Sequence, residues 1–239
     1  MKTPLLVVLT VAVQLLAGCS GRPLVPGERQ ALHRVFGEQV DYDTVRVHDG
    51  VFRRTAKVRQ ALREEGVSLS AMLAEEGLTD DSGEVLSESE AIKRFIGNTP
   101  AFALGNRIYF SRDDYLDNLA YDESGMVRVT DLSLLAHEMM HVWQHQHRDQ
   151  SGYSLAAIIL QNIRYPDRYA FSLRPGKPLL EYRFEQQGAI VELYVHCSYM
   201  PATPYFEQLR EVVGTVFDLS APMRGRVGST SINCLGEYP

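Results

Sequence analysis

The chain has 239 residues, of which 45% are hydrophobic, and it carries a formal net charge of −6 at pH 7. A chain of this length can bury one good-sized core and a small appendage. The acidic balance, and the lack of a dense Lys and Arg stripe with interleaved aromatic residues, argue against nucleic acid as a partner.

The N-terminus has the pattern of a secretory signal peptide over residues 1–18. A single Lys precedes an apolar run from Leu5 to Leu16, which is too short to span a bilayer comfortably. The Leu-Ala-Gly-Cys sequence that ends at Cys19 resembles the bacterial lipobox, whose cysteine is lipidated. The resemblance implies a lipid anchor at Cys19 that holds the chain at a membrane face outside the cytoplasm, in the bacterial cell envelope. Ser20, where Asp is the other choice, is typical of outer-membrane lipoproteins and predicts the periplasmic side of the outer membrane. Ordinary cleavage beside an incidental cysteine is the alternative.

The rest of the chain predicts one folded domain between two short flanking segments. Residues 19–27 contain two prolines and predict a tether. An α+β domain then extends over 28–216, and a Gly-rich tail covers 217–239. In the first part of the domain, a helix, a strand and a broken helical stretch are predicted over 28–36, 44–48 and 52–78. The acidic stretch 79–90 predicts a polar surface insertion.

The second part of the domain begins with two β-like runs, Ala101–Leu104 and Arg107–Phe110. They flank the turn residues Gly105 and Asn106, which is the pattern of a hairpin. The segments that follow alternate between polar loops and helical patterns. Helices are predicted over 132–147, 154–164, 181–199 and 204–216.

The strongest signal for function is His137-Glu138-Met139-Met140-His141, within the predicted helix 132–147. Residues four apart lie on one face of a helix, so the two imidazoles can bind one metal ion. Glu138 then lies beside the open position of the metal. Zinc hydrolases activate water with this arrangement. The alternative is a core helix whose two histidines only meet hydrogen-bond partners.

A catalytic zinc site needs a third protein ligand besides the two histidines. Glu181 and Glu185 share one face of the predicted helix 181–199. Glu185 is favoured because Gly188, one turn later, would let this helix approach the motif helix closely. Glu181 remains the alternative ligand, although a carboxylate in a first turn also complements the helix dipole. His145 and His147 are expected to be exposed polar residues near a helix end.

Two further cysteines, Cys197 and Cys234, allow two interpretations. They can form a disulfide in an oxidising compartment, which would attach the tail to the helix that carries Cys197. They can equally remain two separate buried thiols. Zinc ligation by Cys197 is not expected, because it has no CxxC partner nearby.

Several segments together resemble the zinc-metallopeptidase domain family associated with bacterial contractile injection systems and Vgr-related proteins. They are the run 45–48, the hairpin 101–110 with its Gly-Asn-Arg-Ile-Tyr-Phe sequence, and the motif helix from Leu134 to Gln144. A downstream Glu-Gln-Gln-Ala segment of that family corresponds to residues 185–188. The resemblance covers about residues 28–195. Gly188 stands in place of Ala and His145 in place of a frequent Gln, and neither change removes a proposed ligand.

The resemblance implies a zincin-like α+β fold, with a small mixed sheet packed on the motif helix and a mainly helical C-terminal half. It implies Zn²⁺ held by His137, His141 and Glu185, with Glu138 as the general base in hydrolysis of a peptide or protein substrate. The sheet edge that pairs with an extended peptide would be the strand Arg107, Ile108, Tyr109, Phe110 and Ser111.

Two other classes of function remain open. The first is a catalytically inactive zincin-fold lipoprotein that acts as a binding or structural module. The second is a lipoprotein without metal, in which the histidines are core polar groups.

Overall fold

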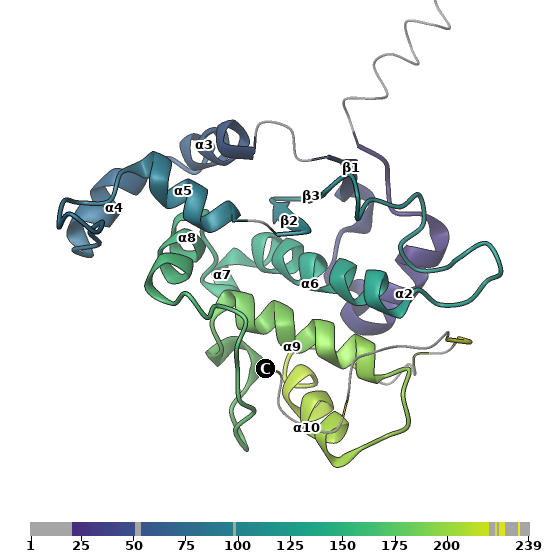
Figure 1. Cartoon of the computed structure of the whole chain (residues 1–239). Coiled ribbons are helices and arrows are strands. Elements are labelled where there is room, and N and C mark those ends of the chain that lie inside the picture. The colour runs from purple at the N-terminus through teal and green to yellow at the C-terminus, as the bar shows by residue number, and fades with distance from the viewer. Residues whose placement is uncertain are drawn as a thin grey trace, which may run out of the picture.

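The chain folds into helices gathered around a small sheet, as seen in a computed structural model that describes residues 21–50, 54–97, 99–219, 223, 225–227 and 234 (Figure 1). In chain order the helices and strands are α2 (Pro26–Phe36), β1 (Arg46–Asp49), α3 (Arg54–Glu64), α4 (Leu69–Glu75), α5 (Glu88–Ile96), β2 (Ala101–Leu104), β3 (Arg107–Phe110), α6 (Val129–Gln146), α7 (Arg148–Ser151), α8 (Leu155–Arg164), α9 (Phe184–Cys197) and α10 (Pro204–Val213). Short 3-10 turns cover Gly37–Gln39, Tyr42–Thr44 and Leu179–Glu181.

The sheet has three strands in the order β1-β3-β2, with β1 parallel and β2 antiparallel to β3. Gly105 makes the tight turn between β2 and β3 in a backbone conformation of positive φ, 60°, which favours glycine. The prediction that residues 107–111 form the sheet edge is therefore wrong. β3 is paired on both sides, whereas β2 is an outer strand beside the motif helix, and no described strand pairs with its other edge.

Two hydrophobic cores organise the molecule. The first contains α2, β1, β3, α6, α9 and α10, and its central packing is α6 against α9. The second contains apolar side chains of α3, α4, α5 and α8. Figure 1 shows α3, α4 and α5 gathered on one side of the sheet, away from α9 and α10. We call the body built on the second core the helical lobe.

Helix α5 was not predicted, because residues 79–90 were expected to be a polar insertion. Only the first part of that stretch is a turn, and Ser87 caps α5 by accepting a hydrogen bond from the backbone N–H of Glu90. Beyond the acidic first turn, α5 buries Ala91, Ile92 and Phe95 in the helical lobe. The polar N-cap and first turn of α5 were therefore mistaken for part of a loop, because the same residue types are common in both.

The predicted tether is also wrong for the residues that the structure describes. Arg22 exchanges two backbone hydrogen bonds with Val47 of β1, both 2.8 Å long. Its guanidinium pairs at 2.8 Å with the fully buried Glu28, and Leu24 is buried in the first core. Residues 21–27 are thus part of the folded body.

The start of the predicted tail is packed as well. Phe217 lies edge-on against Phe36 and Trp143 in the first core. Cys197, at the end of α9, forms a disulfide with Cys234. Among the described residues, no helix is both long and apolar enough to cross a membrane. The predicted signal peptide and Cys19 lie outside the described residues.

Candidate metal centre

Helix α6 presents His137 and His141 on the same face. It begins at Val129, one turn before the predicted start, and nearly all of its residues from 129 to 144 are buried. The two imidazole centroids are 5.1 Å apart, with the rings inclined at 67°. Both rings are more than 90% buried. The helical spacing has therefore placed both imidazoles in one enclosed space, as the motif predicted.

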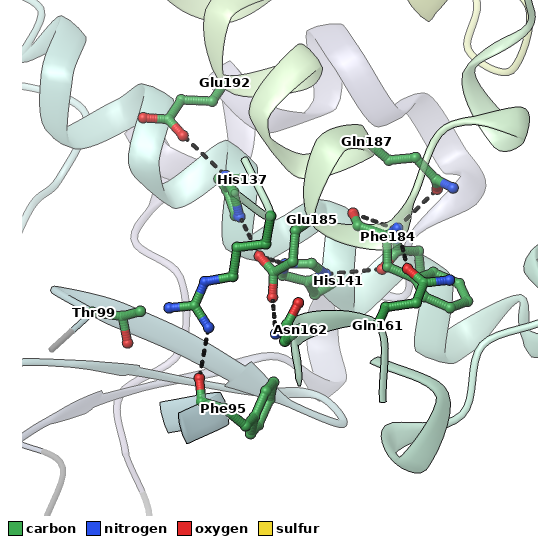
Figure 2. Close-up of polar contacts among 12 residues, drawn as sticks. Phe95, Thr99, His137, His141, Gln161, Asn162, Phe184, Glu185, Gln187 and Glu192 are labelled. Carbon is green, nitrogen blue, oxygen red and sulfur yellow. Dashed lines mark hydrogen bonds and ion pairs between the residues drawn. The ribbon is translucent and has the colours of Figure 1, made fainter. Parts of the chain in front are cut away.

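Glu185 of α9 completes this cluster. One of its oxygens, Oε2, lies 3.4 Å from Nε2 of His137 and 3.4 Å from Nε2 of His141. One ligand atom from each of the three residues lies within 4.8 Å of the others. Figure 2 shows the carboxylate between the two rings. The alternative, Glu181, is exposed in the 3-10 turn before α9 and does not reach the cluster.

The close approach of α9 to α6 depends on Gly188, as predicted. A Cβ atom at this position would lie 2.7 Å from Nε2 of His137, which is far inside van der Waals contact. The glycine therefore makes room for a ligand ring between two packed helices.

Each candidate ligand is held by a further hydrogen bond, and the sequence did not reveal the partners. The Nδ1 of His137 donates to Glu192 over 2.9 Å, and the Nδ1 of His141 donates to the amide oxygen of Gln144 over 2.8 Å. Asn162 of α8 donates to Oε1 of Glu185 over 3.0 Å. Figure 2 shows Glu192 and Asn162 on opposite sides of the cluster. Such outer partners orient ligands in metal sites.

Gln144 also ties α6 to the beginning of α9. Its amide nitrogen donates to the Phe184 carbonyl over 3.3 Å and to Oε1 of Gln187 over 2.9 Å. Gln187 in turn donates to the Tyr182 carbonyl over 2.7 Å. The amide of Gln144 therefore has a fixed orientation, and its oxygen must face His141.

This bonding pattern fits a divalent cation. Because both Nδ1 atoms are donors, a neutral ring presents a lone pair at Nε2, which cannot donate to Glu185. A cation between the two lone pairs and the carboxylate would satisfy all three groups. Two imidazole nitrogens and one carboxylate oxygen are the ligand set of many catalytic zinc sites.

Without a cation, a proton on Nε2 of His137 or His141 can donate a hydrogen bond to the carboxylate of Glu185. Burial by itself lowers the pKa of His137, but hydrogen bonds to Glu185 and Glu192 outweigh it and hold that pKa well above its usual value. Burial likewise raises the pKa of Glu185, yet the nearby His141 and His137 hold it well below its usual range. The carboxylate is thus ionised and ready to bind a cation.

Glu138 lies beside the cluster but outside it. Its Oε2 is buried without a hydrogen-bond partner among the described residues, and burial raises the pKa of its carboxyl. It faces a narrow groove of about 30 Å³ along β2, and it also lines an open pocket of about 340 Å³. Arg168 and Tyr169 line both hollows, and the Tyr169 ring centroid is 5.7 Å from that of His137.

His145 and His147 lie outside the metal cluster, as expected, but they are half-buried rather than exposed. His145 accepts a hydrogen bond from Arg148 at Nδ1, over 2.8 Å, and His147 stacks on Trp143. Arg168 and Tyr169 were not predicted, because they precede α9 in an irregular connection that has no periodic pattern.

Comparison with known proteins supports this description. No family model matches the chain. Over 175 residues, 73% of this chain, the sequence is 29% identical to the type VI secretion system spike protein VgrG2b of Pseudomonas aeruginosa. The match covers only 13% of that much longer protein. Among solved structures, the effector domain of P. aeruginosa VgrG2b matches with a TM-score of 0.51 and 26% identity, covering 88% of this chain and 93% of that domain.

The fold class predicted from the sequence is confirmed. The chain has a mixed α+β fold with a small mixed sheet packed on the motif helix, similar to the VgrG2b effector domain and zincin-like in its arrangement.

Proposed function

We propose that the chain is a zinc-dependent peptidase. The observation that carries this proposal is the cluster of His137, His141 and Glu185, with the unpaired carboxylate of Glu138 beside it. These three residues would hold Zn²⁺. When bound in such a site, Zn²⁺ lowers the pKa of a coordinated water and polarises the scissile carbonyl.

Glu138 has the position and environment of the general base. Glu138 lines both hollows, and its buried Oε2 has no partner among the described residues, so this oxygen is free to accept a proton from the attacking water. The raised pKa of the carboxyl lets Glu138 keep that proton until the leaving amine takes it. The same oxygen thus moves the proton from nucleophile to leaving group.

Tyr169 is the candidate donor to the oxyanion. It lines both hollows beside Glu138 and packs edge-on against His137. Burial, followed by the nearby carboxylates, raises the pKa of its hydroxyl, so the group remains a donor at neutral pH. A donor aimed at the developing negative charge stabilises the transition state more than the ground state.

An extended peptide would pair with β2. Ala101, Phe102 and Ala103 of this strand line the groove that contains Glu138 and His141. On its other side β2 is bonded to β3, so its open edge is available to a further strand. Main-chain pairing with β2 would carry the scissile bond past the metal centre.

The sharpest test is Glu138→Gln. The amide preserves shape but cannot accept the proton, so we expect equimolar zinc by elemental analysis and hydrolysis of a peptide library reduced by about 10²–10⁴-fold. Glu181→Gln, on an exposed turn, is the matched control and should leave both properties intact. Retained turnover in Glu138→Gln would refute the assigned base. Zinc binding with no hydrolysis by the wild type would instead favour a metal-stabilised binding module.

We also propose that a lipid at Cys19 anchors the protein in the cell envelope. The lipobox-like sequence supports the anchor, and the Cys197–Cys234 disulfide is in keeping with an oxidising compartment. Metabolic labelling with a palmitate analogue should mark the wild type and leave Cys19→Ser unlabelled. Equal labelling of both would remove the anchor from the proposal.

A further inference from the structure

A third cavity, larger than the two hollows beside Glu138, has a volume of about 820 Å³ and lies at the turn end of β2. Its charged lining consists of four cations and two carboxylates: Arg46, Lys57, Arg107, Arg148, Glu64 and Glu65. We call this cavity the cationic basin. It lies outside the metal cluster, and the proposed mechanism makes no use of it.

Neutral groups hold three of the four basin cations in place. Lys57 donates to the Tyr109 hydroxyl over 3.3 Å, and its ammonium lies 4.5 Å from the centroid of the same ring. Arg148 donates to Nδ1 of His145 over 2.8 Å. Arg46 donates to backbone carbonyls, and Arg107 is exposed at the start of β3.

No carboxylate neutralises these cations within the described part of the chain. None of the four forms an ion pair of 4.0 Å or less with a described carboxylate. The two glutamates of the basin are engaged with other groups. Glu64 accepts from Gln60 over 2.8 Å, and Glu65 accepts from the Leu155 backbone over 3.0 Å. The basin therefore keeps an excess of positive charge.

The pKa values of the two histidines in the basin, His48 and His145, are lowered by burial as well as by the nearby cations. Burial, with Lys57 and Arg107 next, lowers the pKa of His48 to about 4. Burial and Arg148 lower the pKa of His145. Both rings are thus neutral near pH 7, and the four cations remain the source of the basin's positive charge.

β2 connects the basin to the metal centre. Ala101, Phe102 and Ala103 line the groove beside Glu138, and the next residue, Leu104, lines the basin. Tyr153 and Leu155 line both hollows. Because a strand advances about 3.3 Å per residue, a peptide paired along β2 would reach the basin within a few residues of the scissile bond.

We infer that the cationic basin is a subsite for acidic side chains of the peptide substrate. This inference rests on the proposed function, because β2 supplies the path between the two sites. Ammonium and guanidinium groups recognise carboxylates by charge-assisted hydrogen bonds, and several unneutralised cations in one cavity suit more than one acidic residue. If the peptide is antiparallel to β2, these residues precede the scissile bond.

Binding tests the inference independently of catalysis. The assay uses the full chain carrying Glu138→Gln, loaded with zinc, and two labelled peptides that differ only in an acidic run, Asp and Glu against Asn and Gln. Fluorescence anisotropy at low salt should show at least about tenfold tighter binding of the acidic peptide. Added NaCl should reduce this preference, since screening weakens exposed charge pairs.

Two double variants locate the effect. Lys57→Gln with Arg107→Gln removes two basin cations and should abolish the preference. Arg63→Gln with Lys93→Gln changes the net charge equally on exposed helix positions outside the basin, and it should leave the preference intact. Circular dichroism checks that both variants remain folded. Equal binding of the two peptides, or equal loss in both variants, would overturn the inference.

The outcomes also separate this inference from the proposed function. Acidic preference in binding, without hydrolysis by the wild type, would support the subsite and refute the peptidase. Hydrolysis by the wild type, with no preference for the acidic peptide in binding, would support the peptidase and refute the subsite. A single-stranded DNA oligonucleotide serves as competitor. If it displaces the peptide at lower concentration than the unlabelled acidic peptide does, the basin is a general polyanion site and the inference fails.

Discussion

The charged groups near the two ends of β2 differ in whether they have partners within the chain. At the metal end, His137, His141 and Glu185 are buried, and each is matched by a partner within the protein. At the basin end, four cations face an open cavity without a described carboxylate partner. Buried ionisable groups that have partners within the chain indicate a site whose geometry the fold itself fixes. Cations without carboxylate partners at an open cavity indicate that a negatively charged ligand binds there.

The largest effect should come from removing the third ligand. Glu185→Gln replaces the ionised oxygen between the two imidazoles, so the affinity for zinc should fall by roughly a thousandfold or more. Competition with a chromophoric chelator measures the affinity. Unchanged affinity in Glu185→Gln, together with a loss in Glu181→Gln, would transfer the ligand role to the alternative carboxylate.

A smaller effect should follow from changing the outer partner of His137. Glu192→Gln keeps a hydrogen-bond acceptor for Nδ1 but removes its charge. Zinc affinity should decrease by about 10–100-fold, as for other outer-shell changes. Glu207→Gln on the exposed face of α10 is the control. If both variants bind zinc equally, Glu192 has no part in the centre.

Tyr169→Phe tests the oxyanion donor. The ring and its packing remain, while the hydroxyl is lost, so kcat should fall by about a hundredfold with little change in KM. Zinc content should stay at one equivalent. A change confined to KM would assign Tyr169 to substrate binding instead.

The smallest effect should appear at the basin end, as a dependence of stability on pH. The folded protein keeps His48 neutral down to about pH 4, whereas the unfolded imidazole takes up a proton near its usual pKa of 6.5. The free energy of unfolding should therefore decrease as the pH falls from 6.5 to about 4. Urea titrations over this range measure the slope.

The basin cations contribute to this pH dependence of stability, because Lys57 and Arg107 add to burial in lowering the pKa of His48. Lys57→Gln should raise the pKa of His48 and make the slope shallower, because one of the groups that lowers this pKa is gone. His48→Gln should remove the contribution, whereas His33→Gln on the exposed face of α2 should not. An unchanged slope in His48→Gln would contradict this assignment.

The metal end was largely predictable from the sequence, since it depends on local spacing. His137 and His141 are four residues apart on one helix, and Gly188 marked the face of α9 that approaches them. Glu192 and Asn162 could not be predicted in the same way. Their roles depend on how α9 and α8 are rotated against α6, which no single segment encodes.

The basin end was missed for a related reason. Strand order is a tertiary property, so the hairpin 101–110 alone did not tell which of its strands is the edge. In the sequence, Lys57 resembles a residue on the solvated face of a helix, and Arg107 was expected to belong to an edge strand that pairs with the substrate. The basin cations come from four separate elements, β1, α3, β3 and α7, and only the tertiary fold brings them together.

Asn162 links the candidate metal centre to the helical lobe, because its hydrogen bond joins α8 to Glu185. This asparagine belongs to α8, whose apolar side packs in the second core, yet it donates to a carboxylate that also lies against two imidazole rings of α6. The carboxylate of Glu185 thus joins α8 to α6 and α9. A ligand that binds only the folded cluster stabilises every contact that the fold needs to form it, so a bound cation should stabilise the attachment of the helical lobe together with the centre itself.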